Sequence, residues 1–255
     1  MSDEMSTRPL ALITGGVRRV GVVIAAHFAA AGYDLALTSH AETQPDPATA
    51  AALSQSGSRW HVFTADLSDA STIAPLLADV VAHFGRFPDV LVNNAAMFGQ
   101  DDWTQMNAGT LDAHFRLNTF APILLTQALV AVNADAQPCI INILDQRIQN
   151  PNSDQISYTL SKQALAASVR SMAAAYGPRA RVNGVAPGLV IATDDYNDAQ
   201  VERLGKMMPL GALPDADGVA QAALYLASAR HVTGQIIFAD GGAHLKSFDR
   251  DFMHL

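Results

Sequence analysis

In this 255-residue chain, Tyr158 and Lys162 form a candidate catalytic pair, because their side-chain types and their spacing suit proton transfer. They stand four positions apart in a segment with helical apolar spacing, so both side chains fall on one face of a helix. A neighbouring ammonium lowers the pKa of a phenol, which could then exchange a proton with a substrate near neutral pH. The alternative is an ordinary surface contact between a tyrosine and a lysine.

A glycine-containing turn at residues 14–21, with the sequence TGGVRRVG, is the second candidate site. Its glycines allow the backbone to approach a pyrophosphate, and the following helix supplies free N–H groups and a positive dipole at its amino end. Because the spacing is not G-x-G-x-x-G, a turn without a ligand is the alternative. Its position between a predicted strand and a predicted helix favours dinucleotide binding.

The end of the second predicted strand bears on which dinucleotide binds. It reads Thr38-Ser39-His40, and no carboxylate follows until Glu42. A carboxylate at the strand end would accept hydrogen bonds from a ribose 2′-hydroxyl and repel a 2′-phosphate. Arg18 in the glycine turn could contact the same phosphate, the alternative being an arginine exposed to solvent. We therefore predict NADPH as the cofactor.

Short apolar runs alternate with longer segments of helical period, the pattern of repeated strand–helix–strand units. Strands that are apolar throughout suit a parallel sheet covered by helices on both faces. No linker divides the chain, so residues 1–255 are expected to form a single α/β domain. We predict strands at 10–13, 34–38, 60–65, 90–92, 139–144, 181–185 and 235–239, and helices after residue 16 and at 71–84, 111–132 and 156–175.

The segment 188–214 has no clear period and follows a predicted strand. Ligands bind beyond the carboxyl ends of the strands in open α/β sheets, so we predict a substrate lid here. A surface excursion without a functional role is the alternative.

Composition and charge exclude other classes of protein. Hydrophobic residues make up 49% of the chain and charged residues 16%, which is too apolar for a disordered protein. The net charge of −8 argues against a nucleic acid or an anionic membrane as partner. No apolar run reaches the roughly 20 residues of a membrane helix, and the lone Cys139 fits a reducing compartment, so we predict a cytoplasmic protein. The histidines lack the spacing of metal ligands, so no metal site is expected.

These motifs make the chain resemble the short-chain dehydrogenase/reductase family over nearly its whole length. The order and spacing of several weak motifs carry the resemblance: residues 14–21, 65–67, 93–96, 118, 158–162, 187–188 and 240–242. The resemblance implies a Rossmann-type, doubly wound sheet of seven parallel strands flanked by helices. It also implies a homotetramer that assembles through its alanine-rich helices.

The resemblance further implies roles for the matching residues. Tyr158 would donate the proton, Lys162 would hold the nicotinamide ribose and bias the phenol, and Asn118 would position a water in the proton relay. Pro187 and Gly188 would approach the nicotinamide. Further cofactor contacts would come from Gly15, Arg18, Arg19, Val20, Gly21, Ser39, His40, Asp66 against the adenine, Leu67, Asn94, Ala95 and Ala96.

Two departures from the family pattern concern the substrate. Arg19 stands where the family has glycine, and Asp145 stands where it has a serine, thirteen residues before Tyr158. A serine hydroxyl donates a hydrogen bond to a substrate carbonyl, whereas an ionised carboxylate cannot and would repel a developing oxyanion. Asp145 therefore suits either a protonated side chain or a substrate that reacts at a nitrogen. Arg19 could bind a polar planar ring as well as a phosphate.

The same departures resemble the pteridine reductases and dihydromonapterin reductases within this family. Phe98 falls where those enzymes stack an aromatic ring on the pterin, the alternative being an ordinary core phenylalanine. Ala96 differs from the serine that some pteridine reductases carry there. We predict NADPH-dependent reduction of a dihydropterin C=N bond, with substrate contacts from Arg19, Phe98, Asp145 and Tyr158. The alternatives are a reductase of a ketone or sugar carbonyl and, from another class, a non-catalytic NADP-binding redox sensor.

Overall fold

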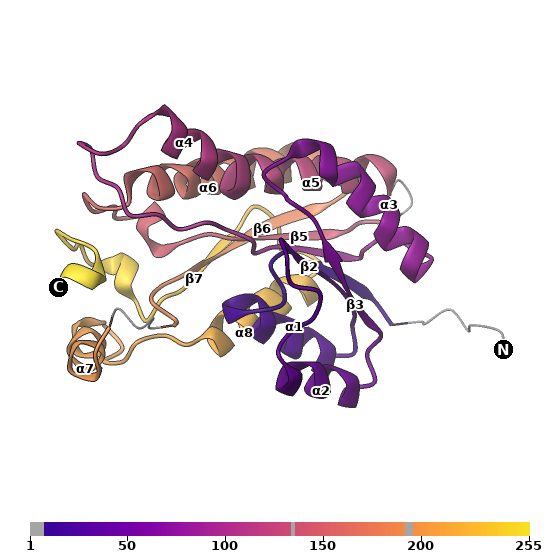
Figure 1. The fold of residues 1–255 in the computed structure, drawn as a ribbon, viewed down its shortest axis with the longest axis horizontal. Coiled ribbons are helices and arrows are strands. Elements are labelled where there is room, and N and C mark those ends of the chain that lie inside the picture. Colours follow the sequence, from indigo (N-terminus) through magenta and orange to yellow (C-terminus); the bar gives the residue numbers. More distant parts are fainter. Residues whose placement is uncertain (1–7, 134–135, 192–195) are drawn as a thin grey trace.

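Seven parallel strands form one sheet in the computed structural model, which describes residues 8–133, 136–191 and 196–255 (Figure 1). All the predicted strands are present and the predicted fold class is confirmed. Five of the strands are buried along their whole length, as expected of strands covered on both faces. The strands are β1 (Leu10–Ile13), β2 (Asp34–Ser39), β3 (Trp60–Thr64), β4 (Val90–Asn93), β5 (Cys139–Ile143), β6 (Arg181–Pro187) and β7 (Ile236–Ala239).

The strand order β3-β2-β1-β4-β5-β6-β7 reverses direction between β1 and β4. In register, Ala11 of β1 lies opposite Leu35 of β2 on one side and Val90 of β4 on the other. In doubly wound sheets, ligands bind in the crevice beyond the carboxyl ends of the strands at this reversal. Residues that follow β1 and β4 are therefore placed at the binding crevice.

Helices cover both faces of this sheet (Figure 1). On one face lie α1 (Arg19–Ala30), α2 (Pro47–Gln55) and α8 (Ala216–Ser228). The other face carries α3 (Ile73–Phe84), α4 (Ala108–Phe115), α5 (Ala121–Val132) and α6 (Ile156–Tyr176). Helix α7 (Asp198–Met207) lies beside the carboxyl-terminal residues at one end of the sheet, and neither α7 nor α8 is among the predicted helices.

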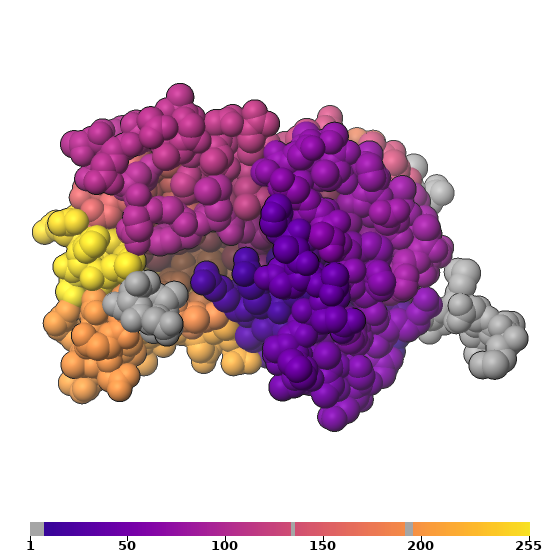
Figure 2. Space-filling view, in the orientation of Figure 1, coloured from indigo at the N-terminus to yellow at the C-terminus, as the bar shows by residue number. Residues whose placement is uncertain are grey.

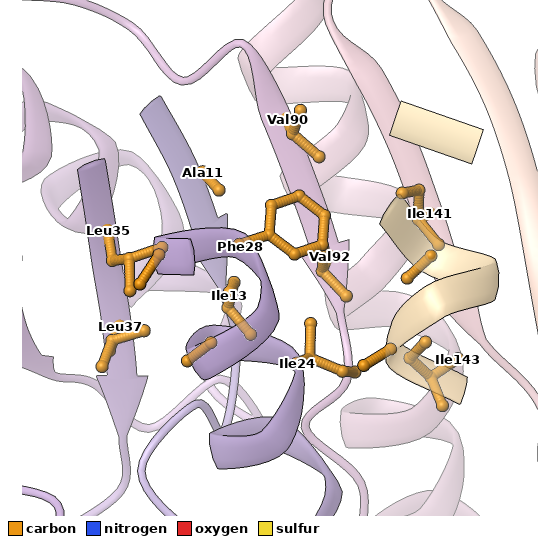
Figure 3. Close-up of a cluster of buried hydrophobic side chains, with 14 of the residues drawn as sticks. Ala11, Ile13, Ile24, Phe28, Leu35, Leu37, Val90, Val92, Ile141 and Ile143 are labelled. Carbon is orange, nitrogen blue, oxygen red and sulfur yellow. The ribbon is translucent and has the colours of Figure 1, made fainter. Parts of the chain in front are cut away.

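Phe28 and Ile24 of α1 lie at the centre of one of the two main apolar cores (Figure 3). Both side chains have no exposed surface, and full burial of a side chain of this size contributes about 1.5–3 kcal/mol. The packing fixes α1 against the sheet and so fixes the position of its amino end. The strand residues of this core are Ala11, Ile13, Leu35, Leu37, Val90, Val92, Ile141 and Ile143.

The predicted helix 111–132 begins earlier than expected and is irregular. A π-helical turn, Arg116–Phe120, joins α4 to α5 and carries the fully buried Asn118. Turns of this kind inside α-helices often occur at functional sites. The irregularity could not be read from the apolar spacing, which continues through the turn.

The continuous helix Ala108–Val132 has the length and mean hydropathy of a candidate membrane span, although Asp112 and Arg116 interrupt its apolar residues. About 44% of its most apolar window is buried inside the protein, and it contacts α3 and α6. A core helix of a globular protein has these properties too, and its apolar character is accounted for by this packing.

The predicted lid, 188–214, begins where β6 ends and contains α7. Residues 192–195 of this segment lie outside the described residues. Asn197 caps α7 by accepting a hydrogen bond from the backbone N–H of Gln200 at 2.9 Å. The function of this segment as a lid stays a prediction.

Candidate active site

The turn after β1 takes its shape from Gly15 and Gly21. Gly15 has a φ of +61°, in the left-handed region that glycine adopts readily. A Cβ on Gly21 would lie only 2.0 Å from the carbonyl oxygen of Gly15, so any other residue would clash with the backbone. The turn can therefore pack closely on the first turn of α1, as in sites where a helix amino end receives a phosphate.

Asn94 joins this turn to the end of β4. Its Nδ2 atom donates to the carbonyl oxygens of Thr14 at 2.9 Å and Gly15 at 3.2 Å. The hydroxyl of Thr14 accepts hydrogen bonds from the backbone N–H groups of Asn94 and Ala95, both at 2.9 Å. These bonds fix the two strand ends that border the crevice. Thr14 therefore supports the site, although it is not among the predicted cofactor-binding residues.

Arg19, the first residue of α1, has a φ of +51°. This left-handed conformation costs energy for an arginine, and it explains physically why a glycine would suit the position. The Arg19 side chain is exposed at the crevice and has no hydrogen bond or ion pair within residues 8–133, 136–191 and 196–255. Arg19 therefore presents an uncompensated positive charge to the crevice.

A cavity of about 370 Å³ lies along the crevice. Figure 2 shows that the surface is hollowed beside the indigo amino-terminal part. It is lined by these predicted site residues: Gly15, Arg18, Arg19, Val20, Gly21, Ser39, His40, Asp66, Leu67, Asn94, Ala95, Ala96, Phe98 and Tyr158. The wall also contains residues that were not predicted: Val17, Thr38, Glu42, Ala65, Met97 and Leu117. Five predicted residues are not part of the wall: Asn118, Asp145, Lys162, Pro187 and Gly188.

Glu42 places a carboxylate at the end of this cavity where a 2′-phosphate is predicted. Its Oε1 atom lies 3.1 Å from Nη1 of Arg18, and its Oε2 atom accepts a hydrogen bond from the hydroxyl of Ser39. The hydrogen bond from Ser39, followed by backbone N–H groups and Arg18, lowers the pKa of Glu42. Arg18 therefore already has an anionic partner, which a phosphate would have to displace.

Asp66 and His40 form an exposed pair on the same cavity wall. Asp66 Oδ1 lies 3.9 Å from Nδ1 of His40. The side-chain hydroxyl and backbone N–H of Ser68 donate to Asp66 at 2.6 and 3.0 Å and lower its pKa. An exposed carboxylate here could accept a hydrogen bond from an adenine amino group, and this role stays a prediction.

Tyr158 and Asp145 meet at the catalytic end. Tyr158 lies on α6, and its hydroxyl donates to Oδ2 of Asp145 at 3.0 Å. Asp145 follows β5 and caps a short 3-10 helix, Gln146–Ile148, by accepting the backbone N–H of Arg147 at 2.8 Å. Burial, and then the charge of Asp145, raise the pKa of Tyr158 well above its usual value of 10. The phenol therefore keeps the proton that a general acid must donate.

Lys162 lies close to Tyr158 on α6 but faces a backbone group. Its Nζ atom donates to the carbonyl oxygen of Ile143 at 2.7 Å and lies 5.9 Å from the centre of the Tyr158 ring. Burial lowers the pKa of Lys162 from 10.5 to about 8. Burial and Asp145 raise the pKa of Tyr158 and Arg147 opposes them, while the expected lowering of that pKa by Lys162 stays a prediction.

Arg147 is the main site residue that sequence reasoning missed. Its side chain is buried, and its guanidinium carbon lies 5.5 Å from the ring centres of both Phe98 and Tyr158. Its Nε atom lies 3.6 Å from Oδ1 of Asp145. Burial by itself would lower the pKa of Arg147, but Asp145 and Asp251 raise it above its usual value. The catalytic end therefore contains a fixed positive charge.

Asn118 uses its side chain to fix the segment after β4. Its Oδ1 atom accepts the backbone N–H of Met97 at 2.9 Å. Its Nδ2 atom donates to the Met97 carbonyl oxygen and to the Ser161 hydroxyl, each at 3.0 Å. Both N–H donors of this amide are therefore in use. A water in the predicted relay therefore could not accept a hydrogen bond from the Asn118 side chain. It would have to contact another side chain or the backbone of the π-helical turn.

Phe98 lies in the cavity wall and is 48% exposed. The centre of its ring lies 4.9 Å from that of Tyr158, in an edge-to-face arrangement. The alternative of an ordinary core phenylalanine is therefore wrong, because a core side chain would be buried. An exposed ring beside a phenol offers an apolar face on which a flat ligand can stack.

Pro187 and Gly188 lie where β6 ends and the chain passes β7. A Cβ on Gly188 would lie 3.1 Å from Cα of Asp240, so the backbones approach too closely for a side chain. Asp240 is buried and accepts hydrogen bonds from the backbone N–H groups of Gly242 and His244. This packing fixes the end of β6, and its contact with a nicotinamide stays a prediction.

The residues of the crevice fit a phosphate-bearing dinucleotide. The position of Gly21 leaves no room for a Cβ, as a close backbone turn beside a pyrophosphate requires, and Arg19 offers a cation with no partner within the described residues. Ser39 and Arg18 offer a hydroxyl and a guanidinium at the far end, once Glu42 is displaced. Each of these groups is a donor that a phosphate can accept from.

Comparison with known proteins shows that the chain is similar to several reductases. The chain matches a family model described as enoyl-(acyl carrier protein) reductase over residues 16–244. It is 30% identical to pteridine reductase 1 of Leishmania tarentolae, and the match covers 94% of this chain and 97% of the relative. The identity is spread over nearly the whole length of both proteins.

Two solved structures resemble this one equally well. The alternative dihydrofolate reductase 1 (FolM) of Brucella suis, in complex with NADP, has 31% identity and a TM-score of 0.84, over 96% of this chain and 98% of its own. A 3-oxoacyl-[acyl-carrier protein] reductase of Brucella melitensis has 31% identity and a TM-score of 0.84, over 95% of this chain and 100% of its own. Overall similarity therefore does not distinguish a pterin-type substrate from a ketone, and the distinction has to come from the site.

Proposed function

The chain belongs to the short-chain dehydrogenase/reductase family, and we propose that it is a pteridine reductase that reduces a dihydropterin C=N bond. It is an oxidoreductase of this family, and its cofactor is NADPH, in keeping with the NADP complex of the Brucella suis structure. The substrate is the part of the proposal that rests on individual side chains.

One observation carries the pteridine assignment: the group that faces the Tyr158 hydroxyl is a carboxylate. Asp145 accepts hydrogen bonds from Tyr158 and from the backbone N–H of Arg147, so its contacts are those of an acceptor. A carboxylate has no proton to donate to a ketone oxygen, and it repels the negative charge that develops there. It stabilises the positive charge of a ring nitrogen that is being protonated, as C=N reduction requires.

Bound NADPH supplies the hydride, and the side chains of the catalytic end orient the ring and deliver the proton. Tyr158 donates its hydroxyl proton to the ring nitrogen, and Asp145 holds that hydroxyl in position. Phe98 stacks on the flat ring from the cavity wall. Arg19 binds polar atoms at the edge of the ring together with the cofactor phosphate. Lys162 holds the nicotinamide ribose once the cofactor has reached it.

Two other functions remain in competition. A ketone or sugar reductase is supported by the likeness to the 3-oxoacyl reductase, which equals the likeness to the dihydrofolate reductase. In that case Asp145 would play no part in the choice of substrate. A non-catalytic NADP-binding sensor would need the dinucleotide crevice alone. The hydrogen bond between Tyr158 and Asp145 argues against the sensor, because binding of a dinucleotide does not require it.

The direct experiment measures NADPH oxidation with four compounds side by side: dihydrobiopterin, dihydromonapterin, dihydrofolate and the β-ketoester ethyl acetoacetate. We expect kcat/KM to be highest for one of the pterin compounds. A higher kcat/KM for the ketoester would replace the proposal with the carbonyl reductase. NADPH binding without oxidation of the nucleotide by any substrate would replace it with the sensor.

We also propose that the protein is a homotetramer. A mostly apolar groove between α4 and α6 is lined by Leu111, Asp112, Phe115, Phe120, Leu160 and Gln163, and Phe120 is 48% exposed. Exposed apolar surface of this kind is commonly covered by another subunit. Gel filtration with light scattering should give four chains per particle, and a clean monomer would reject this part of the proposal.

A further inference from the structure

Arg147 is held entirely by protein groups, although it lies at the catalytic end. Its Nη2 atom lies 2.9 Å from Oδ2 of Asp251, and its Nη1 atom donates to Oε1 of Gln155 at 2.6 Å. With Nε facing Asp145, each of its nitrogen atoms points at a residue of this chain. A guanidinium whose three nitrogen atoms all face protein groups is held in one orientation and can position its neighbours.

Asp251 brings the carboxyl-terminal segment, residues 251–255, to the catalytic end. Asp251 is buried and also caps the 3-10 helix Phe252–His254 by accepting the backbone N–H of Met253. The segment is anchored a second time by Gln200 of α7, whose Nε2 atom donates to the Phe252 carbonyl oxygen at 3.0 Å. The segment 251–255 is therefore attached both to the catalytic end, through Asp251, and to α7, through Gln200.

A further bond fixes where Asp251 can lie. The backbone N–H of Asp251 donates to Oδ2 of Asp154 at 2.7 Å, and the same carboxylate accepts from Nε of Arg250 at 2.9 Å. Asp154 precedes α6, the helix that carries Tyr158. The carboxyl-terminal segment thus contacts both the start of the catalytic helix and the cation beside the catalytic tyrosine.

We propose that Arg147 and Asp251 are a positioning pair, through which the carboxyl-terminal segment holds Asp145 and Tyr158 in catalytic geometry. Without the cation, the buried carboxylate of Asp251 and the partly buried carboxylate of Asp145 would both lose their charge compensation. With it, the two carboxylates and the Tyr158 ring surround one fixed charge. The proposal rests on the catalytic use of Tyr158 stated above.

The charged and titratable groups that face Tyr158 come from three parts of the chain. Asp145 and Arg147 follow β5, Lys162 lies on α6, and Asp251 belongs to the carboxyl-terminal segment. Arg147 lowers the pKa of Tyr158, against burial and the two carboxylates, which raise it. Loss of the pair would therefore alter both the orientation and the acidity of the phenol.

The test is a double-mutant cycle between Asp251→Asn and Tyr158→Phe, with Asp249→Asn as the matched control. Asp249 is an exposed carboxylate in the same part of the chain. In the wild-type background we expect Asp251→Asn to lower kcat by about 10- to 100-fold, the cost of a small misplacement. We expect the KM for NADPH and the Kd for NADP⁺ to stay within about twofold, because the pair lies outside the dinucleotide cavity wall.

The Tyr158→Phe background separates positioning from a general structural role. If Asp251 acts through Tyr158, adding Asp251→Asn there should lower kcat no further, because the group that it positions is gone. An additive loss would overturn the proposal, as would wild-type kcat in Asp251→Asn. Arg147→Lys gives a second arm, since it keeps the charge without the guanidinium geometry, and it should lower kcat while the melting temperature stays within a few degrees.

Dihydrobiopterin is the substrate for these measurements, or ethyl acetoacetate if the pterin is not reduced. This choice separates the two proposals. Reduction of the ketoester alone would overturn the pteridine reductase and leave the cycle interpretable. Unchanged kcat in Tyr158→Phe would overturn the catalytic use of Tyr158, and with it the positioning pair.

Discussion

The hydroxyl of Tyr158 donates its hydrogen bond to a carboxylate, Oδ2 of Asp145, across 3.0 Å at the wall of the cavity. The carboxylate orients the phenol and places negative charge next to the position of the reacting atom. Such an arrangement favours a substrate that becomes more positive as it reacts, and it disfavours one that becomes an oxyanion.

Asp145→Ser should therefore change the order of substrates. We expect it to lower kcat/KM for a dihydropterin by about 10²-fold or more, and to leave the ketone activity equal or higher, since a serine hydroxyl can donate to a carbonyl oxygen. The ratio of the two kcat/KM values is the measurement. A larger loss for the ketone than for the pterin would contradict the role given to Asp145.

Tyr158→Phe should lower kcat by about 10²–10⁴-fold, the usual contribution of a general acid. The ring that contacts Phe98 and Arg147 stays, so Kd for NADP⁺ should change little. Tyr225→Phe is the control, because Tyr225 lies on α8 and is 54% exposed. If the Tyr158 variant turned over substrate like the Tyr225 variant, another group would have to supply the proton.

Glu42→Gln should strengthen the binding of NADP⁺ by about two- to fivefold, because the carboxylate that occupies Arg18 and Ser39 is removed. Binding of NAD⁺, which lacks the 2′-phosphate, should not improve. Glu202→Gln is the control, since Glu202 forms an exposed ion pair with Lys206 on α7. Fluorescence titration gives both dissociation constants, and equal Kd values for NADP⁺ in wild type and Glu42→Gln would show that Glu42 does not compete with the phosphate.

The sheet was predictable because its strands are short apolar runs buried on both faces. Helix α8 has its buried residues at helical spacing, Val219, Ala220, Ala223 and Leu226, but alanines make that apolar face faint in the sequence. Helix α7 buries only Leu204 and Gly205, so burial left almost no pattern to read there. The π-helical turn has no signal of its own in apolar spacing.

The candidate site divides in the same way. The spacing of Tyr158 and Lys162 predicted a shared helix face, and the glycine turn predicted the cavity wall, because both are local patterns. The contact of Glu42 with Ser39 could have been predicted from the sequence, since the two residues are three apart at the end of a strand. The ion pair of Arg147 with Asp251 was not, because only the path of the folded chain brings these segments together.

Arg19→Gly should raise the melting temperature of the protein and lower its affinity for NADP⁺. Arg19 has a φ of +51°, and release of this strain is worth about 1 kcal/mol, or about 2–4 °C in melting temperature. Loss of the cation should raise Kd for NADP⁺. Arg18→Gly is the matched control, because Arg18 has an extended backbone with a φ of −154° and no such strain to release. An equal gain in melting temperature for both variants would rule out backbone strain as the cause.

Lys162 gives the cofactor-free protein a specific dependence of stability on pH. Burial lowers the pKa of Lys162 to about 8, whereas in the unfolded chain it returns to the ordinary 10.5. Between these values the unfolded state binds more protons than the folded state, so the free energy of unfolding rises with pH through this window. The rise can reach about 1.4 kcal/mol per pH unit. Lys162→Met removes the titrating group and leaves the others.

Urea unfolding of both proteins from pH 8 to 10 isolates this contribution, because groups that titrate equally in both cancel in the difference. Below pH 10 most unfolded tyrosines keep their protons, which limits the contribution of opposite sign from the raised pKa of Tyr158. We expect the wild type to gain stability relative to Lys162→Met as the pH rises. Parallel curves would mean that Lys162 keeps its ordinary pKa in the folded protein, and that its ammonium is charged beside Tyr158 throughout this range.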